Sequence, residues 1–166
     1  MELEPAIKTA IEFETGAVDI YARAGAAATE DIGRRVFGVL ADEERHHKAY
    51  LENRLAEWRR EGRITSAKLA TAIPAADLLA AATTRIDDAF TGRPNGDELA
   101  HLRRAYAVEV EANRFYGELA AALEGDARAV FGRILEIEAG HLALVKAEID
   151  FLTGTGLLFD FHGLNT

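Results

Sequence analysis

The sequence predicts an all-α protein, built as a four-helix bundle with one long crossover connection between the second and third helices. The 166 residues include only three prolines, Pro5, Pro74 and Pro94, so long helices can run uninterrupted between them. Apolar residues recur at intervals of three, four and seven, as on the buried face of a helix. With 49% hydrophobic residues, the chain has enough apolar surface for the core of a single domain over residues 1–166.

The four long helices are expected at about 5–28, 31–60, 97–123 and 126–152. Pro5 fits the opening turn of the first helix, where a backbone N–H has no acceptor within the helix. The connection at 62–95 is too long for a tight turn and includes a shorter helical stretch around 75–90. It is therefore predicted to be the kind of long crossover that joins two halves of some four-helix bundles.

Composition excludes several classes of function. The formal net charge of -9 argues against a protein that binds nucleic acid or an anionic membrane, because both need a clustered basic surface. The segment Met1 to Lys8 lacks a signal-peptide pattern and no apolar run is long enough to span a bilayer, so a cytoplasmic protein is expected. Without cysteine, any metal site must use oxygen and nitrogen ligands.

One helix pattern occurs twice, which indicates an internal duplication. Val36, Phe37, Gly38, Glu44 and His47 recur 94 positions later as Val130, Phe131, Gly132, Glu138 and His141. A glutamate and a histidine three residues apart project from one side of a helix and can bind the same metal ion. Both pairs lie within the apolar stripe of their helix, where an unpaired charge costs several kcal/mol. We therefore expect these side chains to bind a cation.

Other glutamates and histidines on the second helix were weighed against this pair. Glu43 and His46 have the same three-residue spacing, but both the apolar stripe and the duplication select Glu44 and His47. His46 is expected to be exposed, and the same is expected of His101 and His162.

The first and third helices carry a second repeated pattern. Glu14 precedes Tyr21 by seven residues, and Glu109 precedes Tyr116 by the same interval, so each pair shares a helix face. The flanking Glu12 and Glu111 are turned away from that face and are predicted to be solvated. Glu111 remains an alternative ligand.

With these residues the chain resembles the rubrerythrin branch of the ferritin-like di-iron carboxylate proteins. In such proteins one glutamate from each of two helices, and a Glu-x-x-His pair from each of the other two, bind two metal ions. The resemblance assigns the six ligand positions to Glu14, Glu44, His47, Glu109, Glu138 and His141. It also suggests that Tyr21 and Tyr116 donate hydrogen bonds to ligand carboxylates; the alternative is that each tyrosine only fills the core.

The resemblance implies two iron ions as the cofactor, although manganese or zinc could occupy the same ligands. Four carboxylates would balance two ferrous ions and leave the buried site nearly neutral. The absence of cysteine excludes a rubredoxin-like iron domain within these residues, so electrons must come from an external donor. Family members dimerise, which makes a homodimer the expected assembly. The apolar tail within 153–166 could cover a bundle end or meet a partner; it includes Leu157, Leu158, Phe159 and Phe161.

The sequence departs from the peroxidase-type rubrerythrins at one position. Those proteins carry an extra carboxylate one turn after the third-helix ligand, where this chain has Ala112, and the equivalent residue after Glu14 is Ala17. The expected function is a di-iron oxidoreductase that reduces peroxide or dioxygen. The alternatives are a ferroxidase or iron-handling protein without turnover, and a metal-stabilised structural bundle. In a plain bundle without metal, these glutamates and histidines would instead face water or pair with arginines such as Arg23, Arg45 and Arg114.

Overall fold

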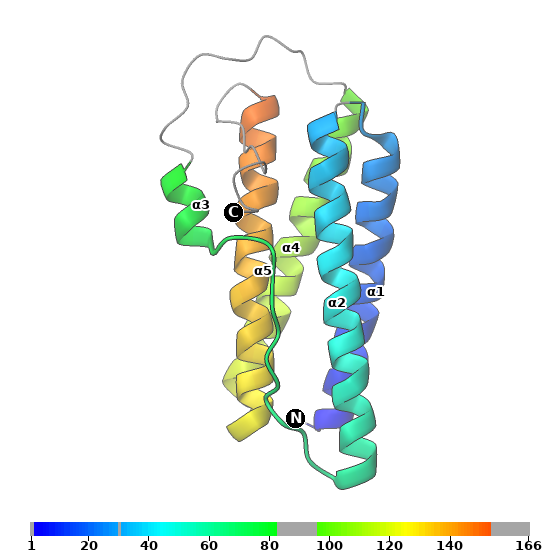
Figure 1. Cartoon of the computed structure of the whole chain (residues 1–166), viewed down its shortest axis with the longest axis vertical. Coiled ribbons are helices and arrows are strands. Elements are labelled where there is room, and N and C mark those ends of the chain that lie inside the picture. Colours follow the sequence, from blue (N-terminus) through cyan, green and yellow to red (C-terminus); the bar gives the residue numbers. More distant parts are fainter. Residues whose placement is uncertain (1, 30, 83–95, 154–166) are drawn as a thin grey trace.

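The fold is an all-α four-helix bundle with an additional short helix in the crossover (Figure 1). The computed structural model describes residues 2–29, 31–82 and 96–153. Their helices are α1 (Leu3–Ala27), α2 (Asp31–Glu61), α3 (Ala76–Ala82), α4 (Gly96–Ala122) and α5 (Gly125–Leu152), and these residues form no strand. The four long helices are confirmed, with every boundary within two residues of its expected position.

The long helices form two hairpins, α1 with α2 and α4 with α5, and the hairpins meet mainly through α1 and α4. The helices α2 and α5 have few close backbone contacts with each other, so side chains fill the space between them. Pro5 lies in the first turn of α1, as predicted. Gly62 directly follows α2 with a φ of 67°, a left-handed conformation that glycine adopts without steric cost and that ends the helix.

The crossover differs in part from its prediction. The expected helix around 75–90 is observed as α3, Ala76–Ala82, and the remainder of that stretch lies outside the described residues. The predictions for the tail beyond Thr153, which concern Leu157, Leu158, Phe159, Phe161 and His162, also lie outside them. None of the described helices carries an apolar stretch long enough to cross a membrane.

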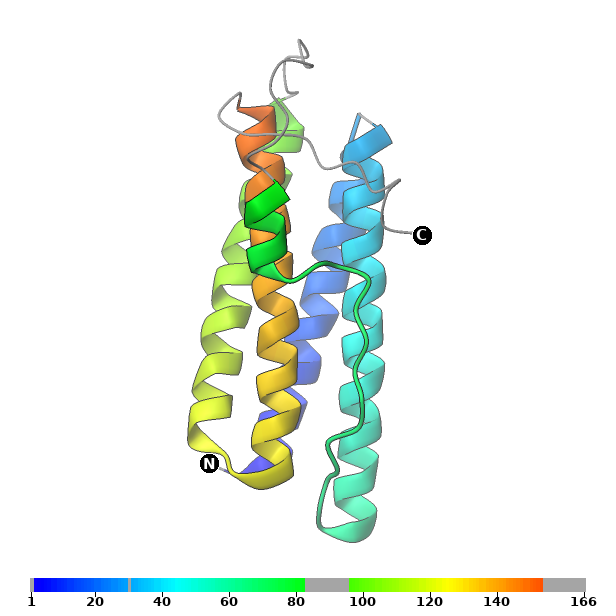
Figure 2. The same ribbon diagram turned by 60° about the vertical axis from the view of Figure 1, so that its left-hand side comes forward.

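Between α2 and α3 the chain follows a non-helical path, which we call the crossover segment (residues 63–75). It runs along α2 and then passes across to the side of α5 (Figure 2). Its apolar side chains Ile64, Leu69 and Ile73 are buried. Two long side chains hold its backbone: the Tyr50 hydroxyl donates to the Ala67 carbonyl at 2.9 Å, and Arg133 Nε donates to the Leu69 carbonyl at 3.2 Å. The segment is thus fixed against both α2 and α5.

The apolar core consists of two clusters. One contains Tyr21 and Phe37, and the other contains their counterparts in the duplication, Tyr116 and Phe131. Along each long helix, the residues of one cluster are separated from those of the other by buried glutamates and histidines. The core therefore encloses a charged layer at mid-height of the bundle.

Candidate metal centre

All six predicted ligands lie in this charged layer, and none is more than 2% exposed: Glu14, Glu44, His47, Glu109, Glu138 and His141. Each occupies the buried stripe of its helix, which continues on either side of the ligands as apolar residues that face the core. The competing possibility of surface pairing with arginine is wrong for these residues. Arg45 and Arg114 instead bond the exposed carboxylates of Asp42 and Glu111.

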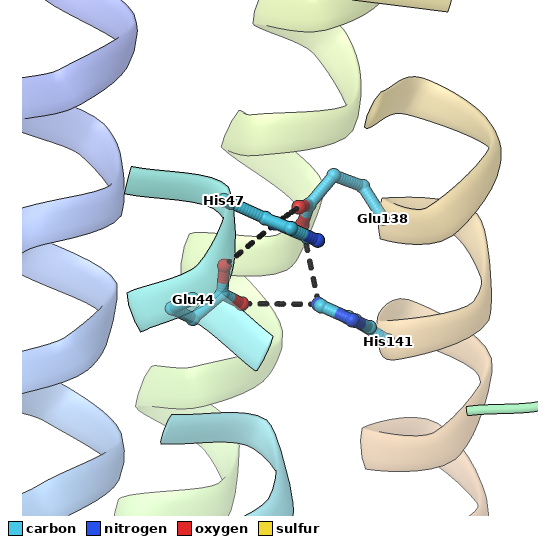
Figure 3. Close-up of side chains that lie close together, drawn as sticks. All are labelled: Glu44, His47, Glu138 and His141. Atoms are coloured by element: carbon cyan, nitrogen blue, oxygen red, sulfur yellow. Dashed lines mark hydrogen bonds and ion pairs between the residues drawn. The ribbon is translucent and has the colours of Figure 1, made fainter. Parts of the chain in front are cut away.

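Four of the six residues form a compact group between α2 and α5 (Figure 3). Glu44, His47, Glu138 and His141 each offer one ligand atom, and these atoms lie within 4.8 Å of one another. His47 Nδ1 is 2.9 Å from Glu138 Oε1 and 3.2 Å from Glu44 Oε2. His141 Nδ1 is 3.0 Å from Glu44 Oε1 and 3.5 Å from Glu138 Oε2. Each imidazole therefore faces the carboxylates of both helices through its Nδ1 atom.

The two remaining glutamates adjoin this group from α1 and α4. Glu14 Oε2 lies 3.6 Å from His47 Nδ1. Glu109 also lies near the group. Burial raises its pKa, and the charges of Glu138 and Glu44 raise it further. Both carboxylates accept a hydrogen bond from a buried tyrosine of the opposite hairpin: Tyr116 donates to Glu14, and Tyr21 donates to Glu109. The tyrosines thus make the contacts that the resemblance suggested.

Burial and charge set the protonation of the group. Burial alone would lower the pKa of His47 and His141, but the surrounding carboxylates raise the pKa of both imidazoles well above the ordinary value. Burial raises the pKa of Glu14, and the nearby charge of Glu44 raises it further. Burial alone would raise the pKa of Glu44, but His141, His47 and Glu14 together outweigh burial, so its pKa is lowered. The raised pKa values favour protons on His47, His141 and Glu14.

The donor atoms fit divalent metal ions. Buried side-chain atoms without a hydrogen-bond partner are uncommon in proteins, yet most of those in the described part of the chain belong to this group. They are Glu44 Oε2, His47 Nδ1, His47 Nε2, Glu109 Oε2, Glu138 Oε1 and His141 Nε2. Oxygen and imidazole nitrogen are ligands for iron, manganese and zinc, and metal binding would displace the protons. The family resemblance and this buried cluster together suggest a di-metal site.

The residues that we set aside as ligands lie mostly where the sequence predicts. Glu12, Glu111 and His46 are exposed. His101 differs from its prediction: it is partly buried, because its position on α4 adjoins the buried Leu102 and Ala105.

The sequence pattern assigns no role to two further polar residues at the site. Glu43 is buried, although Glu44 is preferred to it, and burial alone would raise its pKa. The neighbouring His141 and Thr71 and the hydrogen bond from the Ala72 backbone outweigh burial and lower that pKa to about 2. Glu43 follows Leu40 by three residues and precedes His47 by four, and this spacing indicates that it shares their buried helix face. Asn113 Nδ2 donates to the carbonyls of Glu109 at 2.9 Å and Glu138 at 3.0 Å, which ties α4 to α5 beside two predicted ligands.

Comparison with known proteins agrees with this geometry. The sequence model of the rubrerythrin family matches residues 5–149. Among solved structures, the fold is similar to that of a hypothetical protein, Pfu-1136390-001, from Pyrococcus furiosus, with a TM-score of 0.68 and 20% sequence identity over 95% of this chain and 94% of that one. No curated protein matches the sequence.

Proposed function

The chain belongs to the rubrerythrin family, and from this premise we propose that it is a di-iron oxidoreductase that reduces peroxide or dioxygen with electrons from an external donor. One observation carries the proposal: Glu44, His47, Glu138 and His141 bring four ligand atoms within 4.8 Å of one another in a fully buried layer. A buried group of this composition is costly unless cations compensate the carboxylates. Two divalent ions would do so and would leave the layer nearly neutral.

The six side chains divide naturally between two metal positions. Glu44 and Glu138 each approach both histidines, so each carboxylate would help to hold both metals. Glu14 lies beside His47 and would complete one position. Glu109, whose pKa responds to the charge of His141, would complete the other.

Held by these six residues, two ferrous ions would supply the two electrons needed to reduce hydrogen peroxide, with two protons, to two water molecules, and the external donor would restore those two electrons. The protein's own residues orient the ligands and exclude water. Burial raises the pKa of Tyr21 and Tyr116, so both hydroxyls stay protonated and remain donors to Glu109 and Glu14. The apolar clusters on either side of the charged layer limit access of solvent to it.

An open groove lies between α1 and α4, the helices that carry Glu14 and Glu109. We infer that a small neutral oxidant approaches the site through it. Its volume is about 490 Å³, and its walls include the apolar side chains of Phe13, Ala17 and Ile20. Ala17 lies one turn after Glu14, where a longer side chain would narrow the groove. A mainly apolar wall suits an uncharged molecule, dioxygen above all, better than a ferrous ion, which would have to leave its water for an apolar surface.

The second candidate function is that of a ferroxidase, which oxidises ferrous ions and passes them on. The observation in its favour is the presence of two exposed carboxylates, Glu12 and Glu111, among the residues that line the same groove. Such carboxylates could attract ferrous ions to the entrance.

Rapid mixing distinguishes these functions. Protein loaded anaerobically with two ferrous ions is mixed with peroxide or with dioxygen, and oxidation is followed by absorbance. We expect complete oxidation and repeated turnover when an external reductant is supplied, at a rate unaffected by Glu12→Gln and Glu111→Gln. Continued uptake of added iron, slowed by these two substitutions, would favour the ferroxidase. A protein that retains no iron would contradict both functions.

A further inference from the structure

Glu43 is a buried carboxylate that the proposed set of six ligands does not use. It is 6% exposed and directly precedes Glu44 on α2. One of its oxygens, Oε1, accepts a hydrogen bond from the backbone N–H of Ala72 in the crossover segment at 3.0 Å. The other, Oε2, has no hydrogen-bond partner among the described residues. A carboxylate half satisfied by the backbone and half unsatisfied is an arrangement that calls for a second donor.

The atom that Glu43 Oε2 faces is His141 Nε2, at 3.8 Å. In the described part of the chain, His141 Nε2 is likewise buried without a hydrogen-bond partner. The opposite ring nitrogen, His141 Nδ1, faces Glu44 Oε1 at 3.0 Å and so points into the proposed metal layer. A histidine that binds metal through one nitrogen normally donates its other N–H to a carboxylate or carbonyl, which fixes its tautomer and orientation.

We propose that Glu43 is a positioning residue for His141, linking the crossover segment to one of the two metal positions and making that position bind divalent metal more tightly than the other. The inference rests on the proposed metal site. The two unsatisfied atoms, Glu43 Oε2 and His141 Nε2, become a hydrogen-bonded pair after a small rotation of either side chain. Nδ1 then carries the lone pair that binds the metal, and Nε2 carries the proton.

The duplication leaves the second histidine without this support. The residue that corresponds to Glu43, 94 positions later, is Ile137, which is 3% exposed and has no acceptor atom in its side chain. His47 Nε2, the counterpart of His141 Nε2, has no hydrogen-bond partner within residues 2–29, 31–82 and 96–153. Two metal positions with equivalent ligands thus have different surroundings.

Packing of the crossover segment keeps the backbone N–H of Ala72 within hydrogen-bond distance of Glu43. Ile73 is buried in the core, and the carbonyl oxygen of Pro74 lies so close to α5 that a Cβ atom on Gly140 would approach it to 3.0 Å. Gly140 directly precedes His141, so the segment touches α5 at the level of the metal layer. These contacts on both sides fix the position of the Ala72 N–H between α2 and α5.

The test uses the full chain and titration with Co²⁺, followed by calorimetry and by the visible absorbance of bound cobalt. Wild type is expected to bind two Co²⁺ ions in unequal steps. Glu43→Gln, which preserves shape but places no carboxylate at His141, is expected to weaken the tighter step roughly 10- to 100-fold and leave the other unchanged. Glu43→Asp is expected to weaken the same step by less. Asp42→Asn, at the neighbouring exposed carboxylate, is the matched control and is expected to change neither step.

A second readout reports the proposed hydrogen bond directly. In the cobalt-loaded protein, the ring N–H proton of His141 is shifted by the metal and can be followed by NMR; we expect Glu43→Gln to move its signal and to speed its exchange with water. The inference is overturned if Glu43→Gln alters neither step, or weakens both steps equally. Binding of fewer than two Co²⁺ ions by wild type would instead overturn the metal site itself, and the positioning role with it.

Discussion

The two halves of the chain, α1 with α2 and α4 with α5, repeat the same donors in different surroundings. Each half supplies a Glu-x-x-His pair, a further glutamate and a tyrosine, and each tyrosine reaches the glutamate of the other half. Yet Glu43 corresponds to Ile137, and the closely packed Gly140 corresponds to the exposed His46. A duplication can therefore preserve a set of candidate ligands, while a single crossover that contacts both halves gives the two proposed metal positions different surroundings.

Removal of one histidine from either half should have the largest effect. His47→Ala and His141→Ala each delete an imidazole that the four-residue group requires, so each variant is expected to fall from two metals per chain to one or none. Metal content after anaerobic desalting is the measurement. His46→Ala, which changes an exposed neighbour, should keep two metals. Retention of both metals by either buried-histidine variant would remove the basis for the comparison.

The halves also differ near the end of the bundle, where Glu148 corresponds to Arg54. Burial, together with the charge of Glu98, raises the pKa of Glu148 to about 7, from 4.5 for an ordinary glutamate. Because the folded pKa is the higher one, the stability that the proton provides is present below about pH 4.5 and is lost as the pH rises through 7. The loss amounts to roughly 3 kcal/mol.

Glu148→Gln should therefore be more stable than wild type at pH 8.5, by roughly 2 to 3 kcal/mol, and by less than about 1 kcal/mol at pH 5. Denaturant unfolding at the two pH values measures the difference. Glu136→Gln alters an exposed carboxylate on the same helix and serves as the control. An equal effect of Glu148→Gln at both pH values would show that ionisation is not the cause.

The tyrosines test the part of the comparison in which the halves are alike. Tyr21→Phe and Tyr116→Phe each leave a buried carboxylate without its phenol donor, at a cost of about 1 to 2 kcal/mol in the free energy of unfolding. The two costs should agree closely, because the contacts are related by the duplication. Clearly different values in denaturant unfolding would mean that the asymmetry extends to Glu14 and Glu109.

Gly140→Ala should give the smallest effect, a destabilisation of about 1 kcal/mol. Its new methyl group would press on the Pro74 carbonyl, which outweighs the better helix propensity of alanine. Gly132 lies on the same helix, and a Cβ atom added there would meet open space. Gly132→Ala should therefore stabilise the protein by up to about 1 kcal/mol. If both substitutions stabilise in denaturant unfolding, the crossover segment does not press on α5.

The sequence is sufficient to predict the long helices and the burial of the six proposed ligands, because apolar spacing and the 94-residue repeat both act within single helices. It is insufficient for Glu43 and Asn113, whose partners lie on other elements: Ala72 in the crossover segment and the Glu138 carbonyl on α5. Likewise, nothing local distinguishes Gly140 from Gly132; only the path of the crossover segment does so. Contacts between elements, rather than periodicity within a helix, determine the surroundings of these residues.

Diffraction from crystals of the iron-loaded protein, recorded on both sides of the iron absorption edge, tests the central claim most directly. We predict two anomalous peaks between α2 and α5, about 3.5 to 4 Å apart. One peak should contact His47 Nδ1 and the other His141 Nδ1, with Glu44 and Glu138 shared between them. A single peak, or peaks away from these residues, would contradict the two-metal site.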